Sequence, residues 1–152
     1  MITYEVADVA YAFENLSQYW QEHYKEVGMY TDTFPLEIDR TYYEALENAG
    51  MLLVIVALSD NSPIGYMVWI VKRHPRYPVV VGIADFYWLH KDYRGKTVAY
   101  KMFQYAEEQL KLCGVGRLIA NCKVSNPQGR LLVGLGYEHF EESYTKLLKV
   151  AN

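Results

Sequence analysis

The chain of 152 residues has little cysteine and lacks a long hydrophobic run. Its two cysteines, Cys113 and Cys122, are too few for a disulfide framework and lack the spacing of a metal site, so we expect buried thiols and no bound metal. The most apolar stretch, residues 51–58, is much shorter than the roughly 20 residues that span a bilayer, and the amino terminus lacks a basic-then-apolar leader. These absences predict a cytoplasmic protein without a membrane partner.

Clustered positive charge is also missing from the chain. Its 15 Lys and Arg residues against 18 Asp and Glu residues give a net charge of −3, which opposes nucleic acid as a partner. Binding through Lys72, Arg73, Arg76 and the tyrosines is the weaker alternative. What the chain does contain is apolar surface, with 51% hydrophobic and 15% aromatic residues. That composition is typical of one folded domain, which we expect to span residues 1–152.

The order of the periodic segments predicts an α+β fold. Helices are expected where apolar residues recur at three- and four-residue steps, and strands where short β-branched runs lie between turns. Three consecutive strands should form an antiparallel meander before a strand–helix–strand crossover. We therefore expect a mixed, mostly antiparallel sheet of six to seven strands flanked by about four helices. The expected segments are strand 2–6, helices 9–27 and 41–49, strands 51–58, 64–71 and 79–89, helix 97–113, strand 117–123, a short helix after Asn126, and two strands within 137–150.

Residues 93–99 join an expected strand to an expected amphipathic helix. A Gly-containing turn at that place presents unpaired backbone N–H groups and the positive end of the helix dipole to an anion. Arg94, Lys96 and the Thr97 hydroxyl can add charge and hydrogen bonds, so the turn suits a diphosphate. A solvated basic turn is the alternative. The phosphate-binding loop of nucleotide hydrolases is excluded because His90 stands where that loop needs a glycine.

The same turn resembles the acyl-CoA-binding motif of the GNAT N-acetyltransferases, in which Arg or Gln is followed by two residues, Gly, one residue, and Gly or Ala. Arg94 and Ala99 match this pattern, whereas Thr97 replaces its middle glycine. The element order of the whole chain and the closing Leu135-Gly136-Tyr137 after Asn126 are also similar to that family. A further group of residues resembles the stand-alone acetyltransferases encoded by bacteriophages: Arg73, His74, Tyr77, Ala84, Asp85, Lys123, Glu142, Tyr144 and Lys146.

The resemblance implies an enzyme that transfers an acetyl group from acetyl-CoA to a primary amine by direct attack in a ternary complex. The amine would belong to a small molecule or a protein, and the enzyme would be a monomer or a homodimer. A backbone N–H near Leu89 would polarise the thioester carbonyl. Asn126 is either a helix cap alone or a cap that also holds the pantetheine arm. The implied coenzyme-binding residues are Tyr87, Leu89, Arg94, Gly95, Lys96, Thr97, Val98, Ala99 and Asn126.

The alternative to an enzyme is a GNAT-fold module that binds acyl-CoA without turnover. Two departures from the family pattern motivate it. Thr97 replaces a glycine, and the tyrosine that many members place in the last short helix as general acid would fall near Leu132 or Val133.

Three residues are candidates for the proton transfers of the reaction. Asp85 stands in the otherwise apolar run 79–89, where an ionised carboxylate is costly to bury without a partner. We interpret it as the general base or as the anchor of a cationic acceptor, and pairing with Lys123 or a histidine is the structural alternative. Tyr144, or else Tyr137, would protonate the coenzyme thiolate, with core packing as the alternative for both.

Further residues are candidates for the acceptor site. The resembled family covers its substrate groove with the end of the first helix and the loop that follows, and the loop before the Asp85 strand, with His74 and Tyr77, can reach the same pocket. Core packing is the alternative for Trp20 and Tyr24, which continue the apolar stripe of the helix. An exposed loop is the alternative for His74 and Tyr77. The candidate acceptor-binding residues are Trp20, His23, Tyr24, Tyr30, His74, Tyr77 and Lys123.

Overall fold

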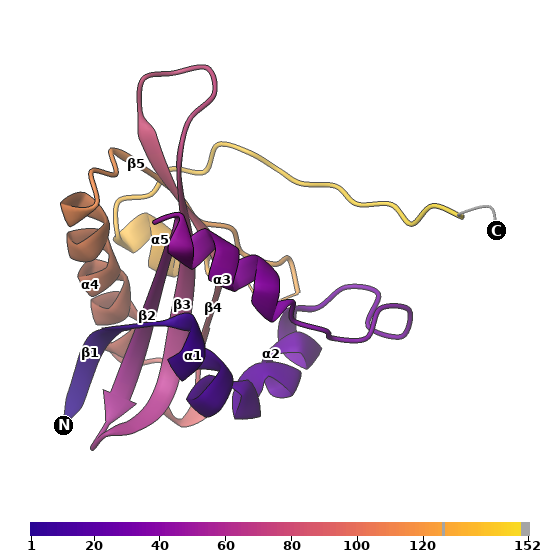
Figure 1. Cartoon of the computed structure of the whole chain (residues 1–152). Coiled ribbons are helices and arrows are strands. Elements are labelled where there is room, and N and C mark those ends of the chain that lie inside the picture. The colour runs from indigo at the N-terminus through magenta and orange to yellow at the C-terminus, as the bar shows by residue number, and fades with distance from the viewer. Residues whose placement is uncertain (126, 150–152) are drawn as a thin grey trace.

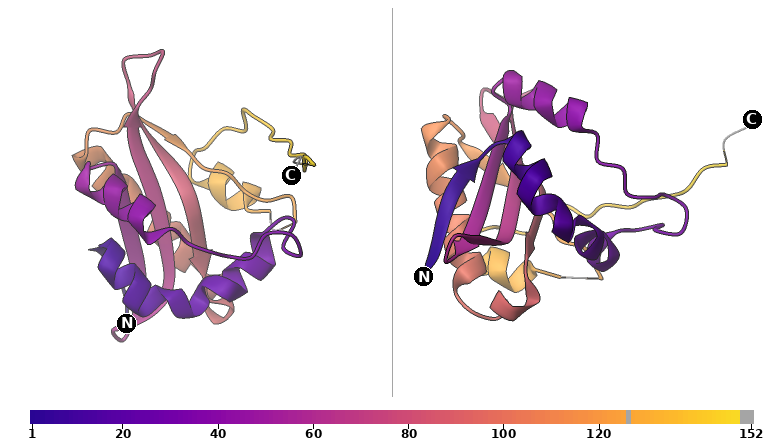
Figure 2. Two further views of the ribbon diagram at one scale, coloured as in Figure 1. Left: turned by 45° about the vertical axis from the view of Figure 1, so that its right-hand side comes forward. Right: turned by 60° about the horizontal axis from the view of Figure 1, so that its bottom comes forward.

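A computed structural model, which describes residues 1–125 and 127–149, contains a five-stranded sheet with helices on both faces (Figures 1 and 2). The strands lie side by side in chain order. Each of the first four is antiparallel to its neighbour, whereas the last is parallel to the fourth. The predicted meander and crossover are therefore confirmed. The strands are β1 (Ile2–Ala7), β2 (Leu52–Ser59), β3 (Ser62–Arg73), β4 (Val80–Leu89) and β5 (Arg117–Ile119).

The helices divide between the two faces of the sheet (Figure 2). The first helical segment was expected to be continuous but consists of α1 (Val9–Tyr11), a π-helical turn, a 3-10 turn and α2 (Trp20–Val27). The Asp8 side chain caps α1 and that of Asp39 caps α3 (Arg40–Asn48). The opposite face carries α4 (Val98–Leu112) and α5 (Gly129–Gly134).

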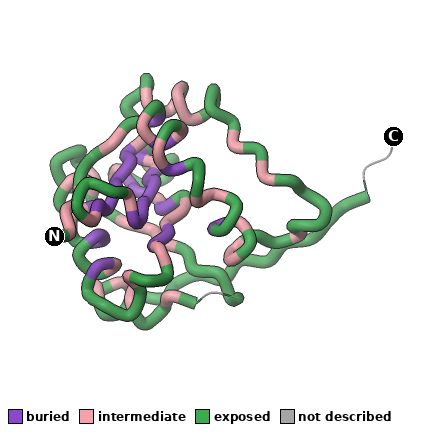
Figure 3. The backbone as a smooth tube through the Cα atoms, turned by 90° about the horizontal axis from the view of Figure 1, so that it is seen from below, coloured by how far each residue is buried: buried purple, intermediate pink, exposed green. Residues whose placement is uncertain are grey.

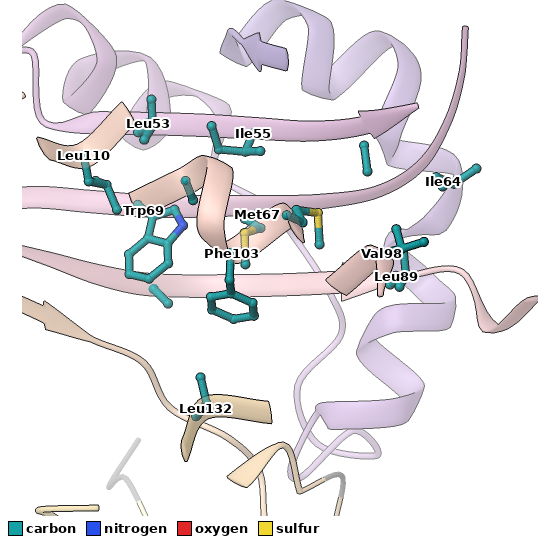
Figure 4. Close-up of a cluster of buried hydrophobic side chains, with 14 of the residues drawn as sticks. Leu53, Ile55, Ile64, Met67, Trp69, Leu89, Val98, Phe103, Leu110 and Leu132 are labelled. Carbon is teal, nitrogen blue, oxygen red and sulfur yellow. The ribbon is translucent and has the colours of Figure 1, made fainter. Parts of the chain in front are cut away.

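Two apolar layers hold the helices to the sheet. Successive side chains of a strand point to opposite faces, so Ile55 of β2 packs toward α4 while its neighbour Val56 packs toward α1. Figure 4 shows the α4 layer, in which Trp69 and Phe103 are fully buried and meet edge to face at 6.2 Å between ring centroids. Seen from below, the buried residues gather at the centre of the molecule (Figure 3). The sheet is thus packed on both faces, and this packing fixes the positions of the strand ends.

The sheet has fewer strands than the sequence predicts. Residues 137–149 form no strand. Tyr137 packs against the core, and the residues after it extend from the body as a tail (Figure 1), while residues 150–152 lie outside the described part. Acidic side chains crowd the segment at Glu138, Glu141 and Glu142, and the consecutive Leu147 and Leu148 would point to opposite faces of a strand. The tail therefore lacks the alternation that would give a strand one apolar face to bury against the sheet. Strand β5 is likewise shorter than expected and ends at Ile119.

The prediction of buried thiols is also wrong. Cys113 and Cys122 are both exposed and unpaired. Cys113 caps the carboxyl end of α4, beyond the last turn that packs on the sheet, and Cys122 follows the early end of β5. Within the described residues, no helix is long and apolar enough to cross a membrane.

Candidate functional site

Strands β4 and β5 separate at the middle of β4. Their parallel pairing stops at Ile83 opposite Ile119, although β4 continues to Leu89. Beyond the end of this pairing, the Tyr87 hydroxyl of β4 donates a hydrogen bond to the backbone oxygen of Asn121 at 2.8 Å. In the described part of the chain, the edge of β4 beyond Ile83 has no neighbouring strand. After Ile119, the described chain returns to pairing only as an isolated bridge at Lys123, so the regular β4–β5 ladder does not cover this part of the edge.

The turn after β4 leads to an uncapped helix. A short 3-10 turn, Lys91–Tyr93, is followed by Arg94, by Gly95 at φ +73° and by Thr97, which begins α4 without a side-chain cap. The first turn of α4 contains no acidic residue. Within the described residues, neither the cap residue nor the first turn thus provides a side chain that offsets the first N–H groups and the positive end of this 15-residue helix. Lys96 and Thr97 are exposed beside it.

Two contacts fix the start of α4 against the sheet. The Val98 side chain is buried in the core, and its carbonyl accepts a hydrogen bond from the Tyr4 hydroxyl of β1 at 3.1 Å. Ala99 packs against the same core cluster, as do Tyr87 and the buried Leu89. The structure therefore brings together the coenzyme-binding residues predicted from 87 to 99, whereas the predicted contact of Asn126 lies outside the described residues.

Arg94 is held by groups that are remote in the sequence. Its Nη2 donates to Glu26 Oε1 of α2 at 2.8 Å, and its Nε donates to the Leu89 carbonyl at 2.7 Å. The guanidinium lies 5.9 Å from the ring centroid of Trp88, whose Nε1 also donates to Glu26 at 3.2 Å. The hydrogen bond from Arg94 is the main cause that lowers the pKa of Glu26, against the effect of burial. The Arg94 side chain is still 39% exposed, so its other N–H groups can meet a ligand.

Asp85 is exposed, which corrects the expectation of a buried carboxylate. A β-bulge is the reason. Trp69 of β3 pairs with Ala84 and Val68 pairs with Phe86, so Asp85 is an extra residue that the bulge turns outward. Its partner is neither Lys123 nor a histidine but Tyr43 of α3, whose hydroxyl donates to Asp85 Oδ2 at 2.6 Å.

Tyr43 keeps its proton at neutral pH. Burial, followed by the bond to Asp85, raises the pKa of its hydroxyl, so the phenol remains a donor and the carboxylate an acceptor. One acceptor position of the carboxylate is thereby used, and the exposed remainder is free to meet a substrate. Sequence reasoning missed Tyr43, since nothing in its helix pattern distinguishes it from the adjacent Tyr42.

The predicted acceptor residues of α2 are packed against the sheet. His23 is 8% exposed, and its Nδ1 lies 2.8 Å from the Tyr66 hydroxyl of β3. Burial lowers the pKa of His23 to about 4. Trp20 meets Phe13 edge to face at 4.8 Å between ring centroids. These contacts support the core-packing alternative for Trp20 and identify His23 as a neutral, buried imidazole at neutral pH.

Tyr24 and Tyr30 shape the loop that follows α2. The Tyr24 hydroxyl donates to the carbonyl of Phe34. Tyr30 adopts a positive φ of 59°, and its carbonyl accepts hydrogen bonds from the backbone N–H groups of Thr33 and Phe34, so both tyrosines hold a compact turn.

Four predicted site residues lie in loops or in the tail, outside the turn that begins α4. The rings of His74 and Tyr77 meet at a tilt, 4.6 Å between centroids, in the β3–β4 hairpin loop at the opposite end of β4 (Figure 1). A strand rises about 3.3 Å per residue, so nearly the whole of β4, roughly 30 Å, separates them from Leu89. Tyr144 lies in the tail, where it is 90% exposed and its hydroxyl donates to Glu142 at 3.2 Å. Lys123 is exposed after β5.

Tyr137 is the candidate acid that packs on the α4 side of the sheet. Its ring centroid lies 6.4 Å from that of Phe103, which in turn meets Tyr87 at 5.2 Å. Its hydroxyl is buried and has no hydrogen-bond partner among the described residues. Burial raises the pKa of Tyr137, so the phenol is protonated at neutral pH. An unpartnered buried hydroxyl is rare in folded proteins and points to a ligand or water partner.

A five-stranded sheet that opens at its fourth strand, with a helix beginning beyond that strand's end, is the arrangement expected of the GNAT fold. The sequence pattern of the acetyltransferase (GNAT) family matches residues 12–137, and the chain belongs to that family. No curated protein sequence matches the chain.

Solved structures confirm the fold. The ribosomal-protein-alanine N-acetyltransferase of Brucella melitensis biovar Abortus 2308 superposes with a TM-score of 0.72 at 17% identity, over 98% of this chain and 100% of that one. A predicted acetyltransferase with acetyl-CoA from Clostridium acetobutylicum gives a TM-score of 0.74 at 15% identity, over 97% and 96%. Glucosamine-6-phosphate N-acetyltransferase of Arabidopsis thaliana gives 0.73 at 11% identity, over 98% and 99%.

Proposed function

We propose that the protein transfers the acetyl group of acetyl-CoA to a primary amine in a ternary complex. The observation that carries the proposal is the uncapped amino terminus of α4, next to the end of β4 where its regular pairing with β5 has stopped. Membership of the acetyltransferase family supports acetyl transfer in general. An amine acceptor is supported by structurally similar proteins that are named for ribosomal-protein alanine and for glucosamine 6-phosphate.

In this proposal, the turn and the first turn of α4 bind the coenzyme diphosphate. The backbone N–H groups from Gly95 to Ala99 are the donors, and Arg94 and Lys96 add positive charge. Thr97 fits this role without being glycine, because its φ of −80° is open to any residue and its side chain is exposed. The pantetheine arm would follow the free edge of β4 past Leu89, with Asn126 as a further predicted contact.

The acetyl transfer itself needs a base and an electrophile. The amine nitrogen attacks the thioester carbonyl carbon, a C–N bond forms, and the C–S bond breaks to release the coenzyme thiolate. Asp85 takes the proton that the amine loses, directly or through water, and Tyr43 holds the carboxylate in place. A backbone N–H near Leu89 stabilises the charge that develops on the carbonyl oxygen. The bulge at Asp85 supports this assignment, since bulges commonly re-aim side chains at active sites.

The thiolate then takes up a proton, and Tyr137 is the better-supported donor. We expect Tyr137→Phe to lower kcat by roughly 10-fold, less than the roughly 100- to 10,000-fold typical of general acids, because a thiolate can also leave as an anion. Stability should not fall, since the hydroxyl has no partner within the described residues to lose. Steady-state kinetics and thermal melts would measure both quantities.

Tyr144→Phe is the matched control for that experiment. Tyr144 lies in the exposed tail and should tolerate the loss of its hydroxyl with unchanged kcat. A normal rate for Tyr137→Phe together with a reduced rate for Tyr144→Phe would instead assign the proton to Tyr144 and require the tail to approach the site.

Acetyl-CoA binding is the direct test of the proposal. A ligand that binds only the folded protein at about 100 times its Kd should stabilise it by about 2.7 kcal/mol, because binding draws the equilibrium toward the folded state. Adenosine monophosphate, which lacks the diphosphate and the pantetheine arm, should stabilise it much less. Thermal melts in which the two ligands stabilise the protein equally, or in which neither stabilises it, would contradict the assignment of the α4 amino terminus as the diphosphate site.

A binding module without turnover is the second candidate function. It is favoured by the absence of a tyrosine in α5, where residues 132 and 133 are Leu and Val. The two functions differ in thiol release. An enzyme produces free coenzyme A from acetyl-CoA when a pool of primary amines is added, whereas a binding module shows the acetyl-CoA melting shift with no thiol release above background.

A further inference from the structure

Glu26 connects the acceptor-side helix to the turn that begins the coenzyme site. It lies in the last turn of α2, and its Oε1 accepts hydrogen bonds from Arg94 at 2.8 Å and from Trp88 at 3.2 Å. Arg94 in turn donates to the Leu89 carbonyl at 2.7 Å. The Glu26 side chain is 25% exposed and that of Arg94 is 39% exposed, so the pair is partly shielded from water. Three separate segments of the chain therefore meet at one carboxylate.

Helix α2 depends on these contacts for its position. At eight residues it is too short to be stable alone. Its interior turn is held by His23 against Tyr66, and its carboxyl end by Glu26. The loop that follows, residues 28–39, contains neither helix nor strand. The Glu26 carboxylate is three-quarters covered and therefore costly to leave without a partner. If the Arg94 guanidinium changes position, we expect the carboxyl end of α2 to move with it so that the pair is kept.

We propose that Glu26 is a positioning residue that couples coenzyme binding to α2 and to the loop after it. The inference rests on the proposed function, because it takes the α4 amino terminus and Arg94 to bind the coenzyme diphosphate. A bound diphosphate restrains the guanidinium through its free N–H groups, the restrained guanidinium fixes the Glu26 carboxylate, and α2 becomes more rigid. Binding of the coenzyme thus prepares the acceptor side of the sheet, and by linkage an acceptor tightens coenzyme binding by the same factor.

Hydrogen exchange with and without coenzyme A tests this coupling, since it needs no knowledge of the acceptor. In the wild-type protein, coenzyme A should slow exchange both in the first turn of α4 and in α2. In Glu26→Gln, which has nearly the same shape but no charge, protection should persist in α4 and be lost in α2. Coenzyme A affinity, measured by calorimetry, should fall roughly fivefold, the lower range of coupling between sites.

Glu22→Gln is the matched control. Glu22 lies one turn earlier in the same helix and is exposed, so its substitution removes the same charge without touching Arg94 and should leave the protection of α2 intact. Arg94→Lys is a second test that leaves Glu26 in place. The lysine keeps the positive charge at this exposed position but lacks the forked donor geometry of the guanidinium. This substitution should therefore also abolish the coenzyme-dependent protection of α2.

The outcomes separate this inference from the proposed function. Coenzyme-dependent protection of α2 that persists in Glu26→Gln or in Arg94→Lys would overturn the coupling while leaving coenzyme binding established. If coenzyme A slowed hydrogen exchange only in α4 of the wild-type protein, the coupling would likewise be overturned and coenzyme binding would remain established. If coenzyme A gave neither stabilisation nor protection anywhere in the wild-type protein, the proposed function would fail, and the coupling with it.

Discussion

Asp85→Asn should lower kcat/KM for acetyl transfer at pH 7 by roughly 100-fold, the lower range for loss of a general base. The amide has nearly the shape of the carboxylate but cannot accept the amine proton. The side chain is exposed and has one hydrogen-bond partner, Tyr43, to which an amide oxygen can still bond, so the melting temperature should hardly change. Initial rates of thiol release and thermal melts measure the two effects separately.

Kinetic constants distinguish the two roles considered for Asp85. Loss of a base lowers kcat, whereas loss of an anchor for a cationic amine raises the KM of the amine and leaves kcat nearly unchanged. Tyr43→Phe is the companion variant, because it removes the group that holds the carboxylate but not the carboxylate itself. It should reduce the rate by a smaller factor, roughly fivefold. Full activity of Asp85→Asn would exclude Asp85 from the mechanism and would leave the conclusion about the fold unchanged.

The features predicted correctly from the sequence are those that depend on local order. The apolar runs specify β2, β3 and β4, and the change from strand to helical spacing after Leu89 specifies α4, so the turn at Gly95 falls where the pattern expects it. Asp85 was selected because a carboxylate is unusual in an apolar strand. The reason for its presence differs from the expectation, since a bulge exposes it, and a bulge depends on pairing with Val68 and Trp69 that no local pattern contains.

Long-range partners could not be predicted. Glu26 and Arg94 are separated by 68 positions, and Tyr43 and Asp85 by 42. Each pair forms because the helices on one face of the sheet meet the end or the bulge of β4, which is a property of the packing and not of either segment. Tyr144 and Tyr137 show the converse. The sequence prefers Tyr144 as the proton donor, but Tyr144 lies in the exposed tail, whereas Tyr137 packs against the core.

Acidification should destabilise the protein through His23. Its ordinary pKa of 6.5 is lowered to about 4 in the folded protein because the imidazole is buried. Above pH 6.5 the ring is neutral in both states, and its contribution to stability is complete. Between pH 6.5 and about 4, the unfolded chain binds a proton that the folded protein does not, so folding free energy is lost. The loss should reach about 3 kcal/mol, at 1.36 kcal/mol for each pKa unit.

His23→Gln isolates this effect from the other groups that titrate. The amide can still bond to the Tyr66 hydroxyl but does not bind a proton in this range. Of the charged groups that act on His23, Glu26 favours the protonated imidazole and Arg94 opposes it, and both are retained in the variant. The pKa of Glu26 is lowered from 4.5, so its own contribution is complete above pH 4.5 and is lost below that pH in the wild-type protein and the variant alike. Urea unfolding at intervals from pH 7 to pH 4 should give a steeper decline for the wild-type protein than for the variant, and parallel curves would show that His23 is protonated in the folded state.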